Sequence, residues 1–293
     1  AQSKGFADEL LDAAFASITL REKVVKADKN QPETKLTLDK YLSTRVPDWK
    51  VKQALEKMQE HAELLNKVEK RYGVQKRFIV ALWGNESNFG RIQGDHPVLS
   101  SLVSLAFDGR REALFKKQFF AALTILSEGH VDIDDFTGSW AGAMGQSQFM
   151  PTSFLSYAVD GDGDGKKDIW STPEDVFSSI ANFLAKEGWN HQQTWGRQVK
   201  LSDSFDINTL STYSGLAKEQ MQVMLAWSNL GVTKFNGAPL PGVNVTASLI
   251  LPDDTSGRIY LVYNNFHTLM RWNRSLYFGV SVGYLADRIR KGS

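Results

Sequence analysis

The apolar positions of this chain recur mostly with a helical period. Between residues 48 and 72 they return every three, four or seven positions, which predicts one long amphipathic helix ended by Gly73. A second apolar run, residues 78–83, leads to Glu86 and stops at Gly90, which predicts a buried helix with a glycine cap. Further helices are expected over residues 5–15, 110–128, 173–187 and 281–290.

The residue pattern changes after Trp189. Short runs of β-branched and aromatic residues there predict strands at 199–201, 245–251 and 258–263. One helix is expected among them near residues 218–230. The polar segment 22–38, which contains Pro32, is expected to be extended. The predicted fold is therefore mainly α (α+β), with an N-terminal helical region at 1–72, a helical core at 73–189, a small β-rich subdomain at 190–263 and a C-terminal return at 264–293.

Composition excludes several classes of function. The 293 residues carry 34 basic and 33 acidic side chains, a net charge of +1, so nothing calls for a nucleic-acid partner. No apolar segment approaches the roughly 20 residues of a membrane span. Cysteine is absent, which excludes disulfides, thiolate metal sites, a cysteine nucleophile and a lipidated cysteine. The start at Ala1 fits a chain whose signal peptide has been removed, but no signal is visible.

Glu86 is the first candidate for chemistry. A carboxyl group at the rim of an apolar helix loses water, which raises its pKa and lets it donate a proton near neutral pH. Ser87 follows it directly, and Trp83 precedes it by three positions. The plain alternative is a glutamate at a helix end that forms an ordinary surface ion pair.

Two other stretches suit a carbohydrate. Residues 138–151, GSWAGAMGQSQFMP, combine glycines that allow close backbone approach with the neutral hydrogen-bonding groups of Ser139, Gln146 and Gln148. Residues 263–278 are dense in aromatic and amide side chains, as an elongated saccharide cleft requires. The alternatives are a packing loop for the first stretch and a domain junction for the second.

The stretch DGDGDGKKDIW, residues 160–170, has the spacing of a calcium loop. Its carboxylates occupy loop positions 1, 3, 5 and 9, Gly165 occupies position 6, and Lys166 at position 7 offers its carbonyl. Position 12, where a calcium loop normally has an acid, is occupied by Ser171. Glu174 or Asp175 could supply the missing carboxylate instead. Hard oxygen ligands favour Ca²⁺, and a solvated acidic turn is the alternative. The ligands predicted from this spacing are Asp160, Asp162, Asp164, Lys166 and Asp168, with Glu174 or Asp175 as the last.

Taken together, these motifs resemble the soluble and membrane-bound lytic murein transglycosylase B family, glycoside hydrolase family 103. The resemblance rests on GNESNFG, on GRR at 109–111, on GSWAGAMGQSQFMP, on the DGDGDG loop, on ANF at 181–183 and on NNF…RWNRS, in the family's order across residues 41–282. It implies a lysozyme-like catalytic core with an N-terminal helical extension and an EF-hand-like loop at 160–175, in which Asp175 would be the last calcium ligand.

The resemblance also implies cleavage of the β-1,4 bond between N-acetylmuramic acid and N-acetylglucosamine in peptidoglycan, leaving 1,6-anhydromuramic acid ends. Glu86 would be the single acid and then base. A second carboxylate, which most glycosidases need, is absent from both carbohydrate-like stretches. The implied substrate-binding residues are Tyr41, Ser87, Arg110, Arg111, Ser139, Gln148 and Asn273. The chain departs from the family at Phe183, Trp272 and Phe278, where tyrosine is common.

The expected protein is a periplasmic enzyme of the soluble type, with a structural Ca²⁺ and no organic cofactor. Its expected partners are peptidoglycan strands, whereas cell-wall synthase partners are undetermined by the sequence. Two rival functions remain: a muramidase that hydrolyses the same bond, and a non-catalytic protein that binds glycans in a Ca²⁺-dependent way.

Overall fold

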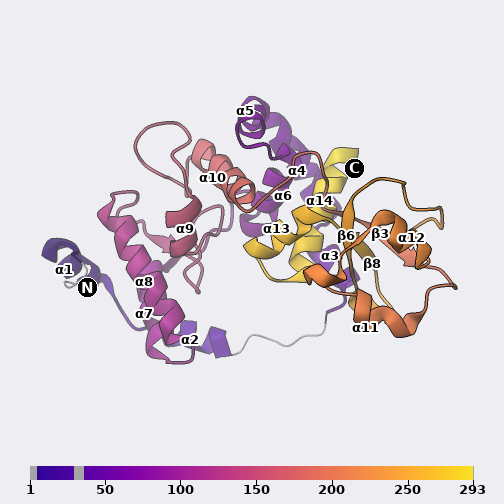
Figure 1. Cartoon of the computed structure of the whole chain (residues 1–293). Coiled ribbons are helices and arrows are strands. Elements are labelled where there is room, and N and C mark those ends of the chain that lie inside the picture. Colours follow the sequence, from indigo (N-terminus) through magenta and orange to yellow (C-terminus); the bar gives the residue numbers. More distant parts are fainter. Residues whose placement is uncertain (1–4, 30–35, 293) are drawn as a thin grey trace. The chain divides into compact units, whose positions relative to one another are not determined.

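The computed structural model describes residues 5–29 and 36–292, which fall into two compact units (Figure 1). Residues 5–29, 61–68 and 82–183 belong to the first unit, and residues 36–60, 69–81 and 184–292 belong to the second. Helices α5 (Ala62–Tyr72), α6 (Lys76–Ser87) and α10 (Pro173–Lys186) each contribute residues to both units. This division differs from the sequence boundaries at 72, 189 and 263.

The first unit is mainly helical and contains one small strand pair. Helix α7 packs on α8 and α8 packs on α9, as Figure 1 shows. Strands β1 and β2 pair antiparallel, with His96 opposite Gly138. The elements that lie wholly in this unit are α1 (Asp8–Ser17), α2 (Glu22–Lys29), β1 (His96–Pro97), α7 (Val98–Phe107), α8 (Glu112–Ser127), β2 (Thr137–Gly138) and α9 (Pro151–Tyr157).

The second unit combines helices with a five-stranded sheet of order β4-β6-β8-β3-β5, in which all neighbours run antiparallel. The five sheet strands are β3 (Gly196–Leu201), β4 (Gln222–Val223), β5 (Val232–Lys234), β6 (Thr246–Ile250) and β8 (Ile259–Val262), and the unit also contains β7 (Pro252–Thr255). Its helices are α3 (Leu38–Arg45), α4 (Asp48–Glu60), α11 (Leu210–Tyr213), α12 (Met224–Asn229), α13 (Asn264–Trp272) and α14 (Leu276–Lys291), with 3₁₀ turns η2 (Ile207–Thr209) and η3 (Lys218–Gln220).

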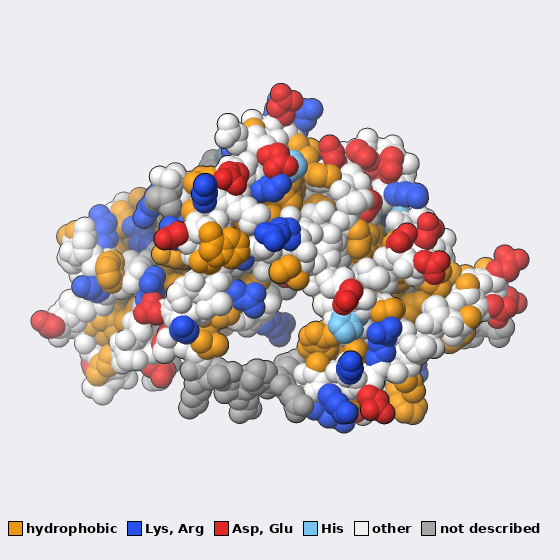
Figure 2. Space-filling view, turned by 180° about the vertical axis from the view of Figure 1, so that it is seen from behind, with side chains coloured by type: hydrophobic (Ala, Val, Ile, Leu, Met, Phe, Trp, Pro, Cys, Tyr) orange, Lys and Arg blue, Asp and Glu red, His pale blue; other side chains and the backbone are white. Residues whose placement is uncertain are grey.

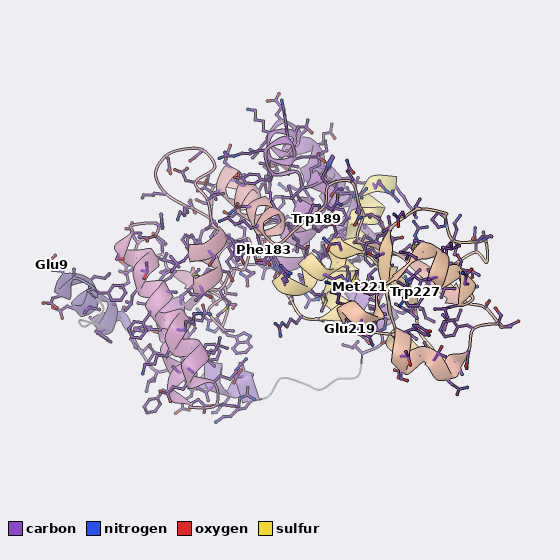
Figure 3. All side chains as sticks on the ribbon, viewed as in Figure 1. Glu9, Phe183, Trp189, Glu219, Met221 and Trp227 are labelled. Atoms are coloured by element: carbon purple, nitrogen blue, oxygen red, sulfur yellow. The ribbon has the colours of Figure 1, made fainter. Side chains whose placement is uncertain are left out.

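The sheet has an apolar core centred on Trp227 of α12, which is labelled in Figure 3. Its indole is fully buried, and Nε1 donates to the carbonyl of Ala247 on β6 at 3.0 Å. A buried indole without this partner would lose hydrogen-bonding free energy, so the bond fixes how α12 lies on the sheet. The three strands expected from sequence are β3, β6 and β8, and the mainly α fold with a small sheet is confirmed.

Helix α6 is buried along most of its length, with residues 78–85 all buried. Residues 78–82 are each 0 % exposed, so the helix is apolar on every side, as a core helix must be. Helix α10 also matches its predicted range and ends before Gly188, whose φ of 91° suits a helix C-terminus.

Two helix predictions are wrong. The single helix expected over 48–72 is α4 followed by α5, with a break at His61. The break brings the His61 ring edge-on to Trp83 and Phe177, at centroid distances of 5.7 and 5.2 Å. The helix expected near 218–230 is instead the turn η3, strand β4 and the short helix α12. Periodicity alone does not detect such breaks, because the apolar spacing continues across them.

Two further corrections concern the termini. Residues 22–29 of the segment expected to be extended form α2, which buries Val24 and Asp28 one turn apart. Residues 30–35 of that segment lie outside the described residues. The C-terminal helix begins at Leu276 rather than Ser281, where the Ser275 hydroxyl accepts from the Phe278 amide and caps it.

Charges of both signs are mixed on the face shown in Figure 2. No helix among residues 5–29 and 36–292 is long and apolar enough to cross a membrane.

Candidate functional site

Glu86 lies in the last turn of α6, half-buried, one residue before the helix ends. The chain then makes a sharp turn in which Asn88, Phe89 and Gly90 have φ values of 50°, 58° and 81°. This left-handed conformation is natural for glycine and unusual for phenylalanine. Buried Phe89 packs edge-on against Trp83 at 5.4 Å, so ring packing holds the strained turn directly after the predicted acid.

Ser87 closes this turn from the inside. Its hydroxyl donates to the Trp83 carbonyl at 3.2 Å and accepts from the Gly90 amide at 3.0 Å. The side chain is fully buried. A hydroxyl occupied in this way shapes the turn beside Glu86, which favours a structural role for Ser87 over the substrate contact that the resemblance implied.

Two glycines allow the glycine-rich loop 138–151 to pack against this turn. A Cβ on Gly90 would lie 2.4 Å from Oε1 of Gln146, and a Cβ on Gly94 would lie 2.2 Å from the carbonyl oxygen of Gly138. Contacts this short exclude any side chain at either position without movement of the neighbour. The pairing of β1 with β2 begins two residues after Gly94. The loop therefore lies directly against the segment that follows Glu86.

Gln146 is the central hydrogen-bonding residue of this loop. Its Oε1 accepts from Nε1 of Trp83 at 2.7 Å, and its Nε2 donates to the Trp170 carbonyl at 2.9 Å. Gln93 donates to the same Trp170 carbonyl at 3.0 Å. The amide of Gln146 thus connects α6, the glycine-rich loop and the acidic loop, a role that the sequence did not distinguish from that of Gln148.

Ser139 and Gln148 are both half-buried in this loop. The Ser139 hydroxyl accepts from the Ala143 amide at 3.0 Å, and Nε2 of Gln148 donates to the carbonyls of Gln93 and Gly145 at 3.0 and 2.9 Å. Gln148 itself has a φ of 50°. The structure thus brings both residues to the loop that packs beside the Glu86 turn, fixed in place by their own hydrogen bonds.

Arg110 and Arg111 share one buried acid, Asp28 of α2. Nε of Arg110 donates to Oδ2 of Asp28 at 3.1 Å, its Nη2 donates to the Asp28 carbonyl at 2.9 Å, and Nη2 of Arg111 donates to Oδ1. The Asp28 side chain is 3 % exposed, whereas those of Arg110 and Arg111 are 52 % and 40 % exposed. Two cations on one anion leave one positive charge at the surface. The sequence missed Asp28, because its segment read as extended and polar.

Tyr41 and Asn273 belong to the second unit. The Tyr41 ring packs edge-on against Tyr277 at 5.5 Å, and Tyr277 donates its hydroxyl hydrogen to the Leu36 carbonyl at 2.9 Å. Exposed Asn273 follows α13, and its Oδ1 accepts from the Ser275 amide at 3.1 Å.

The three family departures lie on helices. Phe183 on α10, labelled in Figure 3, packs against Tyr157 at 4.4 Å, while Trp272 ends α13 and Phe278 lies in the first turn of α14.

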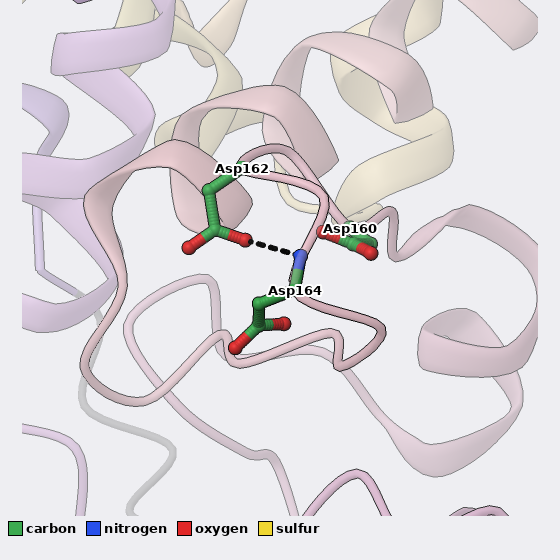
Figure 4. Close-up of side chains that lie close together, drawn as sticks. All are labelled: Asp160, Asp162 and Asp164. Atoms are coloured by element: carbon green, nitrogen blue, oxygen red, sulfur yellow. Dashed lines mark hydrogen bonds between the residues drawn. The ribbon is translucent and has the colours of Figure 1, made fainter.

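The acidic loop brings three of its carboxylates together. One oxygen from each of Asp160, Asp162 and Asp164 lies within 4.8 Å of the others, and Figure 4 shows the three side chains around the loop. Asp160 accepts from the amides of Gly163 and Gly165 at 2.6 and 2.8 Å, and the Gly165 bond holds its pKa below the usual value. The backbone is thus already folded around the cluster. Three neighbouring oxygens of this kind fit a hard dication.

The carboxylates of two further predicted ligands accept hydrogen bonds from backbone amides of the loop. Asp168 accepts from the amides of Trp170 and Ser171, both at 2.9 Å, and is not part of the three-carboxylate cluster. Asp175 is fully buried and accepts from the Gly161 amide through Oδ1 and the Asp168 amide through Oδ2, both at 2.6 Å. Burial raises the pKa of Asp175 to about 6. Asp175, and not half-buried Glu174, therefore ties the two ends of the loop together.

The family described as Transglycosylase SLT domain matches residues 1–287. The chain belongs to this family. Membrane-bound lytic murein transglycosylase B of Escherichia coli (strain K12) is 32 % identical over 232 residues, which are 78 % of this chain and 61 % of that protein. The chain therefore spans somewhat under two thirds of the length of that curated relative.

Several solved structures are similar to this transglycosylase SLT domain. SltB3 of Pseudomonas aeruginosa, in complex with NAG-NAM-pentapeptide, is 40 % identical with a TM-score of 0.93, over 99 % of this chain and 76 % of that one. The Escherichia coli lytic transglycosylase Slt35, in complex with calcium, is 25 % identical with a TM-score of 0.83, over 99 % and 90 % of the two chains. The lysozyme-like transglycosylase fold expected from the motifs is confirmed.

Proposed function

We propose that this transglycosylase SLT domain is a lytic transglycosylase that cleaves the β-1,4 bond between N-acetylmuramic acid and N-acetylglucosamine in peptidoglycan. The observation that carries the proposal is the setting of Glu86. It is the acid of the GNES motif, it lies half-buried at the end of a helix whose residues 78–85 are all buried, and the strained Asn88–Gly90 turn follows it. Family membership over residues 1–287 supports the same activity.

In the proposed reaction Glu86 acts twice. Its carboxyl group first donates a proton to the glycosidic oxygen, and the bond from that oxygen to C1 of N-acetylmuramic acid breaks. The substrate's own acetamide stabilises the positive charge that develops at C1. The carboxylate of Glu86 then takes the proton of the C6 hydroxyl, whose oxygen bonds to C1 and closes the 1,6-anhydro ring. No second carboxylate is needed, which agrees with the neutral side chains of loop 138–151.

Ser139 and Gln148 are the proposed glycan contacts in the first unit. Their loop packs on the Glu86 turn, and neutral hydroxyl and amide groups match sugar hydroxyls and acetamides. Arg110 and Arg111 carry a surplus positive charge on Asp28, which fits an anionic group of the substrate. Tyr41 and Asn273 remain predicted contacts of the second unit.

The mass of the products tests the reaction. Purified peptidoglycan digested with this protein should give fragments with 1,6-anhydromuramic acid ends. Fragments heavier by one water would show hydrolysis and establish a muramidase instead. Binding to peptidoglycan without any release of fragments, equal for wild type and Glu86→Gln, would establish the non-catalytic alternative.

We further propose that the acidic loop holds one structural Ca²⁺. Asp160, Asp162 and Asp164 offer carboxylate oxygens, Lys166 offers its carbonyl, and Asp175 fixes the loop ends with Asp168. The donor set is entirely oxygen, which suits Ca²⁺ and disfavours zinc or copper. The calcium complex of Slt35 supports the ion's identity. This loop would serve as the EF-hand-like element predicted at 160–175.

The proposed substrate places the protein in the periplasm, where peptidoglycan lies. Fractionation of cells that express the full-length protein, followed by detection in the periplasmic fraction, tests this location. Detection only in the cytoplasmic fraction would contradict it.

A further inference from the structure

The short helix α3 carries Tyr41, a proposed glycan contact of the second unit. The helix is eight residues long, and helices of this length are rarely stable alone in water. Its apolar face buries Leu38 and Leu42, and the helix packs against α14 (Figure 1). The position of Tyr41 therefore depends on the neighbours that hold α3.

Asp253 of β7 binds the first residue of this helix. Its Oδ2 accepts from the backbone amide of Leu38 at 2.6 Å, across 215 positions of the sequence. The first amides of a helix have no partner within the helix, and the helix dipole favours a negative charge beside them. Asp253 thus supplies from a distant strand the contact that a capping residue usually supplies from the preceding position.

Asp253 also contacts Tyr277, the residue on which the Tyr41 ring packs. The Tyr277 hydroxyl donates to the Leu36 carbonyl at 2.9 Å and lies within hydrogen-bonding reach of Oδ1 of Asp253. Burial and this carboxylate raise the pKa of Tyr277 to about 12, so the hydroxyl keeps its hydrogen at neutral pH. The rings of Tyr277 and Tyr41 meet edge-on at 5.5 Å. One carboxylate therefore contacts both the start of α3 and the ring beside Tyr41.

The turn that carries Asp253 is shaped for this contact. Asp254 has a φ of 56°, a left-handed conformation that costs free energy in a residue other than glycine. A Cβ on Gly257 would lie 2.6 Å from the Cβ of Asp253. A side chain at position 257 would thus displace Asp253. Strain and close approach at one turn together fix where the Asp253 carboxylate lies.

Two other charged contacts of α3 are weaker. Asp39 pairs with Nε of Arg258 at 2.6 Å, but the two side chains are 66 % and 29 % exposed, and ion pairs open to solvent contribute little. The guanidinium of Arg45 lies 5.6 Å from the centroid of the Tyr41 ring. Because Arg45 belongs to the same helix, it moves with the ring and does not fix it. Asp253 is the stronger determinant of where α3 lies.

We propose that Asp253 is a positioning residue for the glycan: through Leu38 and Tyr277 it holds the Tyr41 ring in the orientation that binds the substrate. The proposal rests on the proposed function, because it takes Tyr41 as a glycan contact. Asp253 lies outside every motif on which the family resemblance rests.

The ring of Tyr41 provides the first test. In protein labelled with ¹³C on the tyrosine rings, the Tyr41 signal is assigned by comparison with Tyr41→Phe. Asp253→Ala should shift this signal, because the ring loses its fixed place beside Tyr277. Asp254→Asn is the matched control, since it removes the neighbouring exposed carboxylate and asparagine tolerates a left-handed φ. It should leave the Tyr41 signal unchanged. An unchanged Tyr41 signal in Asp253→Ala would overturn the proposal.

The kinetic constants give the second test. If Tyr41 is correctly placed only about a tenth of the time in Asp253→Ala, KM for peptidoglycan should rise about tenfold, with kcat near the wild-type value. Asp254→Asn should change neither constant. Each variant is assayed below its melting transition, so that only folded protein is compared. A fall of kcat at unchanged KM would contradict a role in positioning a binding group.

A double variant shows whether Asp253 acts through Tyr41. Tyr41→Ala should raise KM, and the addition of Asp253→Ala to it should raise KM no further, because two residues that act through one contact are not additive. A second rise as large as that of Asp253→Ala alone would show that the two residues act independently and would reject the proposal.

The two proposals fail separately. Wild-type protein that releases no fragments from peptidoglycan would end the proposed function, whereas the Tyr41 ring signal would still decide whether Asp253 positions the ring. Anhydro fragments released with the same KM by wild type and by Asp253→Ala would uphold the proposed function and reject the role of Asp253.

Discussion

The turn after Glu86 and the acidic loop at 160–175 are both irregular and rich in glycine, yet they are held in opposite ways. The first is closed by its own side chains: Ser87 bonds the turn, and Gln146 bonds Trp83. The second bonds its backbone but leaves three carboxylate oxygens within 4.8 Å of one another. In the first region the hydrogen bonds hold neutral side chains in fixed positions, as a preorganised site requires. In the second the clustered carboxylates repel one another until a cation binds between them. The first region is thus suited to chemistry and the second to stability.

Substitution of Glu86 should give the largest effect. Glu86→Gln keeps the size of the side chain but removes its proton transfer, so cleavage should fall about 10³-fold, as expected for general acid–base catalysis. The release of anhydro fragments measures this rate. The melting temperature should remain near that of wild type, because glutamine keeps the size of the side chain and a hydrogen-bonding oxygen.

Glu9→Gln is the matched control, since Glu9 is an exposed residue of α1 (Figure 3). It should change neither rate nor melting temperature. A Glu86→Gln protein that cleaves at the rate of Glu9→Gln would remove Glu86 from the mechanism.

Calcium should give the next largest effect, on stability. Free Ca²⁺ at 100 times its Kd stabilises the folded state by about 2.7 kcal/mol. In a chain of this size each kcal/mol corresponds to roughly 2–4 °C, so chelation should lower the melting temperature by about 5–10 °C. A calorimetric scan with EDTA and then with added Ca²⁺ measures this.

The double variant Asp162→Asn with Asp164→Asn should melt at the same temperature with and without Ca²⁺. Asp134→Asn, an exposed change outside the loop, should respond like wild type. An unchanged wild-type melting curve in EDTA would exclude the structural ion.

A pair of glycines compares the packing of the two regions directly. Gly94 and Gly163 have nearly the same φ, 88° and 86°, so alanine meets the same left-handed strain of about 1–2 kcal/mol at each. At Gly94 the new Cβ would also meet the Gly138 carbonyl at 2.2 Å, whereas nothing lies within 4 Å at Gly163. Gly94→Ala should therefore lose roughly 1–3 kcal/mol more in denaturant unfolding. Equal losses would show that the β1–β2 region accommodates the added methyl group at little cost in free energy.

Sequence patterns predicted the parts of this molecule that depend on local spacing. The acid at the end of an apolar helix, the calcium-loop spacing and the glycine-rich loop are each contained within about fifteen consecutive residues. The sequence did not reveal contacts between distant residues. Asp28 joins Arg110 and Arg111 across more than 80 positions, and Gln146 joins Trp83 across 63. Neither contact leaves a periodic signal, because both depend on which helices become neighbours.

The same reasoning explains why the sequence pattern did not predict the helix break at His61. Apolar spacing continues from α4 into α5, so the pattern reads as one helix. The break is stabilised by the rings of Trp83 and Phe177, which come from elsewhere in the chain. Tertiary packing here overrides local propensity.

The smallest predicted effect separates two serines that the family motif treats alike. Ser87→Ala leaves the Gly90 amide without its hydroxyl acceptor inside the protein, which should cost about 1 kcal/mol of folding free energy. Because Ser87 is fully buried, KM for peptidoglycan should stay unchanged. Ser139→Ala, in the half-buried loop, should instead raise KM several-fold, since its hydroxyl is a proposed glycan contact. Steady-state kinetics and thermal unfolding of both variants measure the contrast. A raised KM for Ser87→Ala at unchanged stability would reverse the assignment and place the Ser87 hydroxyl on the substrate.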